Sequence, residues 1–141
     1  MKSFYKFGFF ILVLLASVKL HGQHRSKIAV ELNSEKKILI IKQEITFFNE
    51  SNDTLTTLVL NDWNNSFSNK NTPLAKRFSD EFYRGFHLAK EEERGSTNNL
   101  VINDINEHLI TWERTKKNPD YITIQLNEPL FPKQKITFNF S

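Results

Sequence analysis

A metal site in a chain without cysteine would depend on histidine and carboxylate side chains. The four histidines are His21, His24, His87 and His108, and no two of them have the spacing that lets two imidazoles converge on one ion. His87 and Glu91 are four residues apart on a predicted helix and could supply two ligands, but this spacing is more typical of two solvated side chains on a helix face. We therefore expect no metal-binding residue in this chain.

Catalysis by a nucleophile or by an acid and base pair has no recognisable basis in the sequence. No serine lies in a Gly-x-Ser-x-Gly turn, and there is no cysteine. The carboxylates of Glu91, Glu92 and Glu93 are consecutive, so on a helix they would fan out and could not face one another. With four glycines in the chain, no glycine-rich phosphate loop is present. The sequence predicts no catalytic and no cofactor-binding residue.

Aromatic side chains offer a weaker indication of ligand binding. Phe78, Phe82 and Phe86 recur every four residues, which could make a stacking surface but is more typical of a helix face buried in a core. Trp63 and Trp112 could stack on sugar rings, yet single tryptophans near loops and strand ends are more often anchors beneath the loop.

The net charge of the chain is carried by its first residues. The formal charge is +3, and Lys2, Lys6 and Lys19 lie in residues 1–22, which contain no acid. Residues 23–141 therefore carry no net charge. Binding to nucleic acid depends on a basic field that neutralises phosphates, so we expect no nucleic-acid partner.

Residues 1–22 have the order of a signal peptide. Lys2 and Lys6 precede an apolar run at 7–18, which is shorter than the roughly 20 apolar residues of a membrane-spanning helix. Cleavage is predicted between Gly22 and Gln23, and an uncleaved anchor is the alternative. The mature chain is then exported to the periplasm, the cell envelope or the medium, with no membrane span, and without cysteine it relies on its core alone.

The mature residues 23–141 have the rhythm of an antiparallel β-sandwich. Alternating apolar residues and intervening turn residues predict seven strands. The first three should form a meander of neighbouring strands, and the first half of the second strand, with isoleucine on both faces, should be covered on both sides. The predicted strands are 27–33, 37–48, 54–60, 99–105, 109–112, 121–126 and 136–140, with a turn at 128–133.

One helix is expected inside this β-rich chain, at about residues 73–94. Thr72 and Pro73 provide a capping hydroxyl followed by proline at the first helical position. Leu74, together with the three phenylalanines that follow at intervals of four residues, should pack one helical face onto the sheet. The last strand ends in mid-pattern at Ser141 with no closing turn, which indicates a fragment of a longer protein.

Three stretches of the sequence resemble a known family. They are ITFFNESNDTLTTLVLN at 45–61, the segment at 60–95, and NEPLFPKQKITFNF at 127–140, in which Lys133 stands where the family often has glycine. Together they resemble the N-terminal domain of aminopeptidase-N-like zinc metallopeptidases (gluzincins), and 60–95 is similar to an insertion in an exported bacterial branch.

This resemblance implies a non-catalytic domain. In such enzymes the N-terminal β-sandwich packs against the catalytic domain, its partner, and helps to wall off the amino end of peptide substrates. The zinc cofactor and its His-Glu-x-x-His motif belong to the following domain and do not occur here. The alternative is a free-standing exported β-sandwich module that binds a peptide or glycan through Trp63, Phe67 and the sheet surface.

Overall fold

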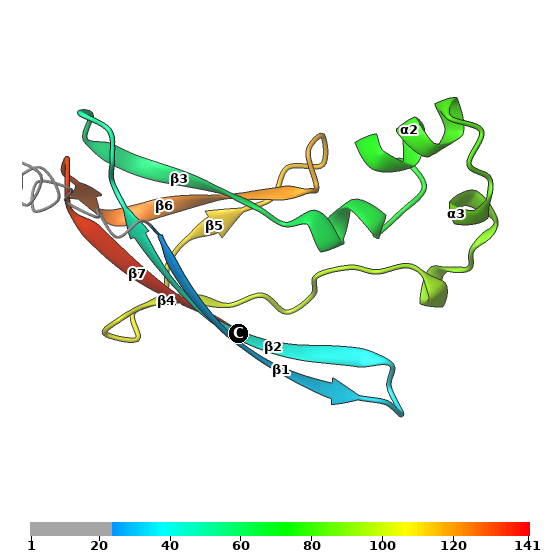
Figure 1. Ribbon diagram of the computed structural model, residues 1–141, viewed down its shortest axis with the longest axis horizontal. Helices are drawn as coiled ribbons and strands as arrows, with labels where there is room; N and C mark the ends of the chain where they lie inside the picture. The colour runs from blue at the N-terminus through cyan, green and yellow to red at the C-terminus, as the bar shows by residue number, and fades with distance from the viewer. Residues whose placement is uncertain (1–23) are drawn as a thin grey trace, which may run out of the picture.

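The computed structural model describes residues 24–141, so the predicted signal peptide lies outside the described residues. Within them the chain is mainly β, with two antiparallel sheets that face each other, as the predicted sandwich requires (Figure 1). One sheet has the strand order β1 (Arg25–Asn33), β2 (Ile38–Phe48), β7 (Lys135–Phe140) and β4 (Ile102–Asp104). The other has the order β3 (Leu55–Asn61), β6 (Tyr121–Leu130) and β5 (Trp112–Glu113).

The core lies between the two sheets and is built from alternate strand residues. Phe138 and Ile102 come from the four-stranded sheet, and Ile122 and Ile124 come from the facing sheet. All four are at most 3% exposed. Residues two apart on a strand share a face, so the predicted alternation in β6 and β7 places Ile122, Ile124 and Phe138 inward.

The predicted meander of the first three strands is wrong at the third. β1 and β2 pair as expected, but β3 pairs with β6 in the other sheet. The chain changes sheets at Asn49, which is buried and whose side chain donates hydrogen bonds to the carbonyls of Asp53 and Leu130 at 2.8 and 3.1 Å. The second edge of β2 is instead occupied by β7, which comes from the far end of the sequence.

The turn predicted at 128–133 is shorter than expected, because β6 runs on to Leu130 through Pro129. The β3 register jumps between Leu55 and Thr57, so Pro129 falls where β6 has no regular ladder partner on β3. Proline is tolerated at such a bulge since no ladder hydrogen bond is lost there. Lys133 then closes the turn with φ of 64°.

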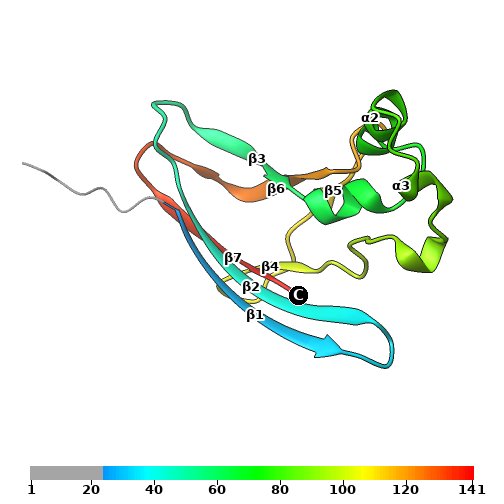
Figure 2. The same ribbon diagram turned by 45° about the vertical axis from the view of Figure 1, so that its right-hand side comes forward.

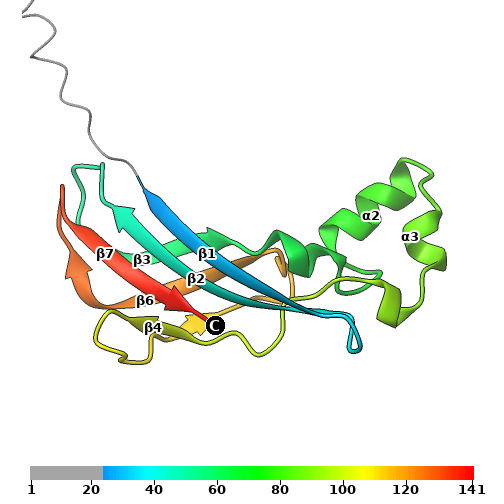
Figure 3. The same ribbon diagram turned by 60° about the horizontal axis from the view of Figure 1, so that its bottom comes forward.

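The single helix expected at 73–94 is divided into short pieces within a segment that we call the helical insertion (residues 62–97). It contains η1 (Trp63–Phe67), α2 (Pro73–Asp80), α3 (Gly85–Leu88) and η2 (Glu91–Glu93). α2 begins as predicted, since Thr72 Oγ1 accepts a hydrogen bond from the amide of Ala75 at 3.1 Å. α2 packs against η1 and α3, so the expected packing of this helix onto a sheet is wrong: the insertion extends beyond the end of the sandwich (Figures 2 and 3).

Candidate functional site

The pair of residues that could have begun a metal site does not form one. His87 lies in α3, and its Nε2 is 2.8 Å from the carbonyl oxygen of Ala75 on α2. Glu91 belongs to the separate turn η2, so the four-residue helical spacing assumed from the sequence does not exist. His87 therefore ties the two helices together.

Residues 24–141 hold no group of three histidine or carboxylate side chains that could bind a metal ion. The zinc implied by the family resemblance thus has no ligand set in the described part of this chain, and no zinc chemistry follows from its residues. Over the same residues, no helix is both long and apolar enough to cross a membrane.

The aromatic residues of the helical insertion form a small core of their own. The ring centroid of Phe67 lies 6.4 Å from that of Phe78 and 6.1 Å from that of Phe86. The core interpretation is thus confirmed for Phe78 and Phe86, but it is wrong for Phe82, whose side chain is 84% exposed. Trp63 packs edge-on against Phe67 at 6.4 Å, but it is 53% exposed, so it is not a buried anchor beneath the loop.

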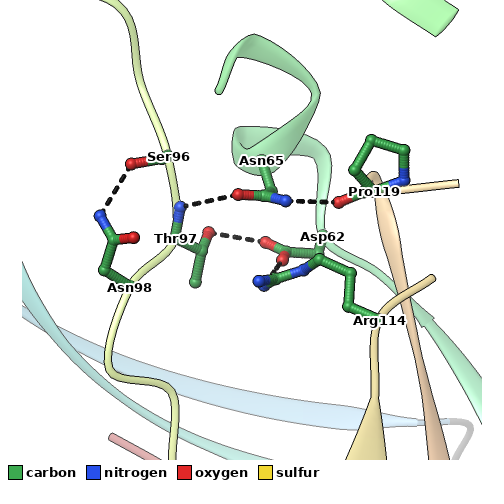
Figure 4. Close-up of polar contacts among 7 residues, drawn as sticks. All are labelled: Asp62, Asn65, Ser96, Thr97, Asn98, Arg114 and Pro119. Atoms are coloured by element: carbon green, nitrogen blue, oxygen red, sulfur yellow. Dashed lines mark hydrogen bonds and ion pairs between the residues drawn. The ribbon is translucent and has the colours of Figure 1, made fainter. Parts of the chain in front are cut away.

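A cluster of polar contacts fastens the helical insertion to the sandwich (Figure 4). Asp62, which follows β3, forms an ion pair with Arg114 and accepts a hydrogen bond from Thr97 Oγ1 at 2.6 Å. Asn65 donates from its side chain to the carbonyl of Pro119 at 2.7 Å. The Arg114 guanidinium also lies over the ring of Trp112, 5.4 Å from its centroid. These contacts join the helical insertion to the residues that follow β5 and precede β6, so the cluster holds structure together. One buried atom of the cluster, Arg114 Nε, has no hydrogen-bond partner among the described residues.

The most informative surface is apolar and lies on the β1 and β2 hairpin. Residues opposite each other in the ladder share a face, and Ile45 lies opposite the buried Phe138. Alternate residues of β2 therefore lie on the same side of the sheet as the core, and this side extends along the hairpin. We call this surface the hairpin inner face; it consists of Ile28, Val30, Leu32, Leu39 and Ile41.

No element of residues 24–141 covers the hairpin inner face. Leu32 is 67% exposed and Leu39 is 59% exposed, although both lie on the side that carries the core further along the strands. The hairpin projects past the end of the facing sheet (Figure 3). The outer face of β2 is also uncovered at Ile38 and Ile40, so the expected burial of this half of β2 on both sides is wrong within the described chain.

A pair of charged residues lies on the outer face of the hairpin at its root, opposite the hairpin inner face. Lys27 and Glu44 form an ion pair at 2.8 Å, and the hydrogen bond from Lys27 holds the pKa of Glu44 below its usual range. Contiguous apolar patches on a monomer, such as the hairpin inner face, commonly mark sites of protein interaction. The hairpin inner face is suited to binding another protein surface.

Sequence reasoning placed these five residues on strand faces but did not single them out as a site. Their alternation is the same whether a facing sheet covers them or not, so the pattern alone could not show that they are exposed. Comparison of the chain with protein-family models, with curated proteins and with solved structures found no match in any of the three.

Proposed function

We propose that this chain is the non-catalytic N-terminal β-sandwich domain of an exported zinc aminopeptidase-like metallopeptidase. It serves as a scaffold and as part of the wall around the peptide substrate, and a separate catalytic domain supplies the zinc. The observation that carries the proposal is the uncovered hairpin inner face, because a domain made to pack against another leaves an apolar flank when it is alone.

The backbone at Lys133 gives further support. The family often has glycine at this position, and Lys133 adopts φ of 64°, a conformation that favours glycine. Its amide donates to the carbonyl of Asn49 at 2.8 Å, and its ammonium donates to the carbonyl of Glu50 at 2.6 Å. The turn therefore keeps the geometry that the family's glycine would favour, and two hydrogen bonds help to hold lysine in it.

The proposal is tested with the catalytic domain that should be encoded beside this chain. The neighbouring reading frame should encode a His-Glu-x-x-His helix, and co-expression of the two parts should yield a zinc-containing complex that hydrolyses aminoacyl nitroanilides. This chain by itself should show no hydrolysis. Absence of such a motif in every neighbouring frame would remove the basis of the proposal.

Substitutions on the two faces of the hairpin distinguish the proposed interface from a general effect on folding. Leu39→Asp places a charge on the hairpin inner face and should lower recovery of the complex about tenfold. Ile40→Asp places the same charge on the outer face of the same strand, at a residue that is also exposed, and should leave recovery unchanged. Equal losses from both variants would contradict the assignment of the inner face.

The behaviour of the chain alone separates this proposal from the free-standing binding module. An exposed apolar flank should make the purified protein associate at high concentration and bind a hydrophobic dye in its folded state. A strictly monomeric protein that binds no dye, and that captures peptides or glycans through Trp63, would favour the binding module.

A further inference from the structure

A pocket lies between the helical insertion and the loop that joins β5 to β6. It has a volume of about 480 Å³, in the range of pockets that hold small-molecule ligands. One wall contains Ser68, Asn69 and Asn71, between η1 and α2, and the other contains Thr115 and Lys116, ahead of β6. We call it the loop pocket. Its lining shares no residue with the hairpin inner face.

The two walls of the loop pocket are joined by the polar cluster that fastens the insertion to the sandwich. The side chain of Asn65 donates to the carbonyl of Pro119 at 2.7 Å, and both residues line the pocket (Figure 4). Arg114 also lines it, and its guanidinium is held by the ion pair with Asp62 and by the ring of Trp112. Side chains that are already held in place lose little conformational entropy when a ligand binds.

The chain on both sides of the loop pocket carries positive charge. Residues 63–79 and 114–119 contain no aspartate or glutamate, and their basic residues are Lys70, Lys76, Arg77, Arg114, Lys116 and Lys117. Residues 23–141 have no net charge, so this excess is local. Asp62 pairs with Arg114, whereas Lys116 has no ion-pair partner within the part of the chain that the structure describes. Cations that line a concave site raise the local concentration of anions.

The other side chains of the loop pocket include hydroxyls and amides, which both donate and accept hydrogen bonds. Ser68 Oγ accepts from the side chain of Asn69 at 3.3 Å, and Thr115 Oγ1 accepts from the amide of Asn118 at 3.2 Å. Neither hydroxyl donates a bond to another of the residues 24–141, and over the same residues the side-chain amide of Asn71 has no partner. Sugar hydroxyls have the same ability to donate and accept, so this lining is suited to a sugar.

We propose that the loop pocket binds a sugar that carries an anionic group. Lys116 and Nη1 of Arg114 bind the anion, while Ser68, Asn71 and Thr115 bind the sugar hydroxyls. A phosphate and a carboxylate would meet the same two cations, so the experiment below distinguishes them. The proposal rests on this pocket alone. It therefore goes beyond the proposed domain contact and does not depend on it.

Titration of the purified protein with four ligands, followed by the amide chemical shifts of Asn71, Thr115 and Lys116, tests the proposal. The ligands are glucose 6-phosphate, glucuronate, glucose and inorganic phosphate. At least one of the two charged sugars should bind, and which of them binds identifies the anionic group. Glucose and inorganic phosphate should each bind at least about tenfold more weakly, because each lacks half of the contacts. Failure of both charged sugars to bind would overturn the proposal, as would equal affinity for glucose 6-phosphate and inorganic phosphate.

Two neighbouring lysines provide a matched pair of variants. Lys116→Ala removes the cation that lines the pocket and should weaken binding of the charged sugar about tenfold. Lys117→Ala removes the same charge from a side chain outside the lining and should leave the affinity unchanged. Both lysines are exposed, so neither substitution should affect folding. Equal losses in the two variants would show that net charge alone attracts the ligand and would overturn the proposal.

Asn71→Asp tests the opposite wall of the loop pocket. The substitution keeps the size of the side chain but places a negative charge in the lining, so the charged sugar should no longer bind. Undiminished binding in this variant would contradict the position of the ligand.

Discussion

The amide of Tyr83 donates to the carbonyl of Phe78 at 2.7 Å and so closes the last turn of α2. Between them, the amide of Phe82 donates to Ser79 at 3.0 Å while its backbone adopts φ of 58°. This is the pattern in which helices commonly end on glycine in the left-handed conformation. A bulky side chain at such a position carries a steric cost, and here the ring is largely in solvent.

Phe82→Gly should therefore raise the free energy of unfolding by about 1 kcal/mol, because glycine adopts this conformation without the steric cost of a Cβ atom. Phe82→Ala is the matched control: it removes the exposed ring but keeps the Cβ atom, so the change should be small. Urea unfolding followed by fluorescence gives both values. A marked loss of stability in the glycine variant would mean that the ring stabilises the fold.

Asp62→Ala should lower the free energy of unfolding by about 2–3 kcal/mol. The substitution leaves the mostly buried guanidinium of Arg114 without its ion-pair partner and removes the acceptor of the Thr97 hydroxyl. Arg77→Ala is the control, since it breaks an exposed ion pair with Glu81, and such pairs contribute little. Similar losses in both variants, measured by urea unfolding, would contradict the structural importance of the cluster.

The stability of the protein should fall in acid partly through Asp104. Partial burial opposes ionisation of this carboxyl, but the backbone amides of His108 and Asn106 donate to it and the net pKa lies below the usual value. A depressed folded-state pKa stabilises the fold above the unfolded-state value of about 4, and this contribution is lost as pH falls through the folded-state pKa. The urea midpoint measured between neutral and strongly acidic pH should fall less steeply in Asp104→Asn. His108→Ala retains the backbone amide and should keep most of the dependence.

Removal of an apolar side chain should cost much more stability in the core of the sandwich than on the hairpin inner face. Phe138→Ala creates a cavity at a fully buried site and should cost about 3–5 kcal/mol of unfolding free energy. Leu39→Ala removes a side chain that is mostly in solvent and should cost less than about 1 kcal/mol. Comparable losses in the two variants would show that the hairpin inner face is covered in solution.

The long strands could be predicted because alternation of apolar side chains is a local property, visible over a few residues. The strand predicted at 99–105 is shorter in the structure, where β4 is Ile102–Asp104, and the strand predicted at 109–112 shares only Trp112 with β5 (Trp112–Glu113). Strand order is not local. From the sequence, Asn49 indicates only a turn. In the structure its buried side chain donates a hydrogen bond to the carbonyl of Leu130 at the point where the chain crosses to the other sheet, in which β3 pairs with β6. Nothing near residue 49 in the sequence indicates that β7, close to the C-terminal end of the chain, occupies the edge of β2 instead.

Apolar sequence patterns did not predict the shape of the helical insertion or the exposure of the candidate site. Phenylalanines at intervals of four residues predicted one helix, but the chain turns at Phe82 and only part of the stripe enters the small core. Exposure of Leu39 depends on the reach of the facing sheet, which no strand pattern specifies. By contrast, the cap at Thr72 was predictable because it involves residues three apart.

The hydrogen bond from Thr97 to Asp62 brings together the two ends of the helical insertion, and this affects which changes of length the sequence can tolerate. The residues at the two ends of the helical insertion meet through a single hydrogen bond of 2.6 Å, so the segment between them departs from the sandwich and returns to nearly the same point. Lengthening or deleting such a segment changes little in the backbone that carries the sheets. In the evolution of proteins with this fold, residues 63–96 are accordingly where gains and losses of whole stretches should accumulate.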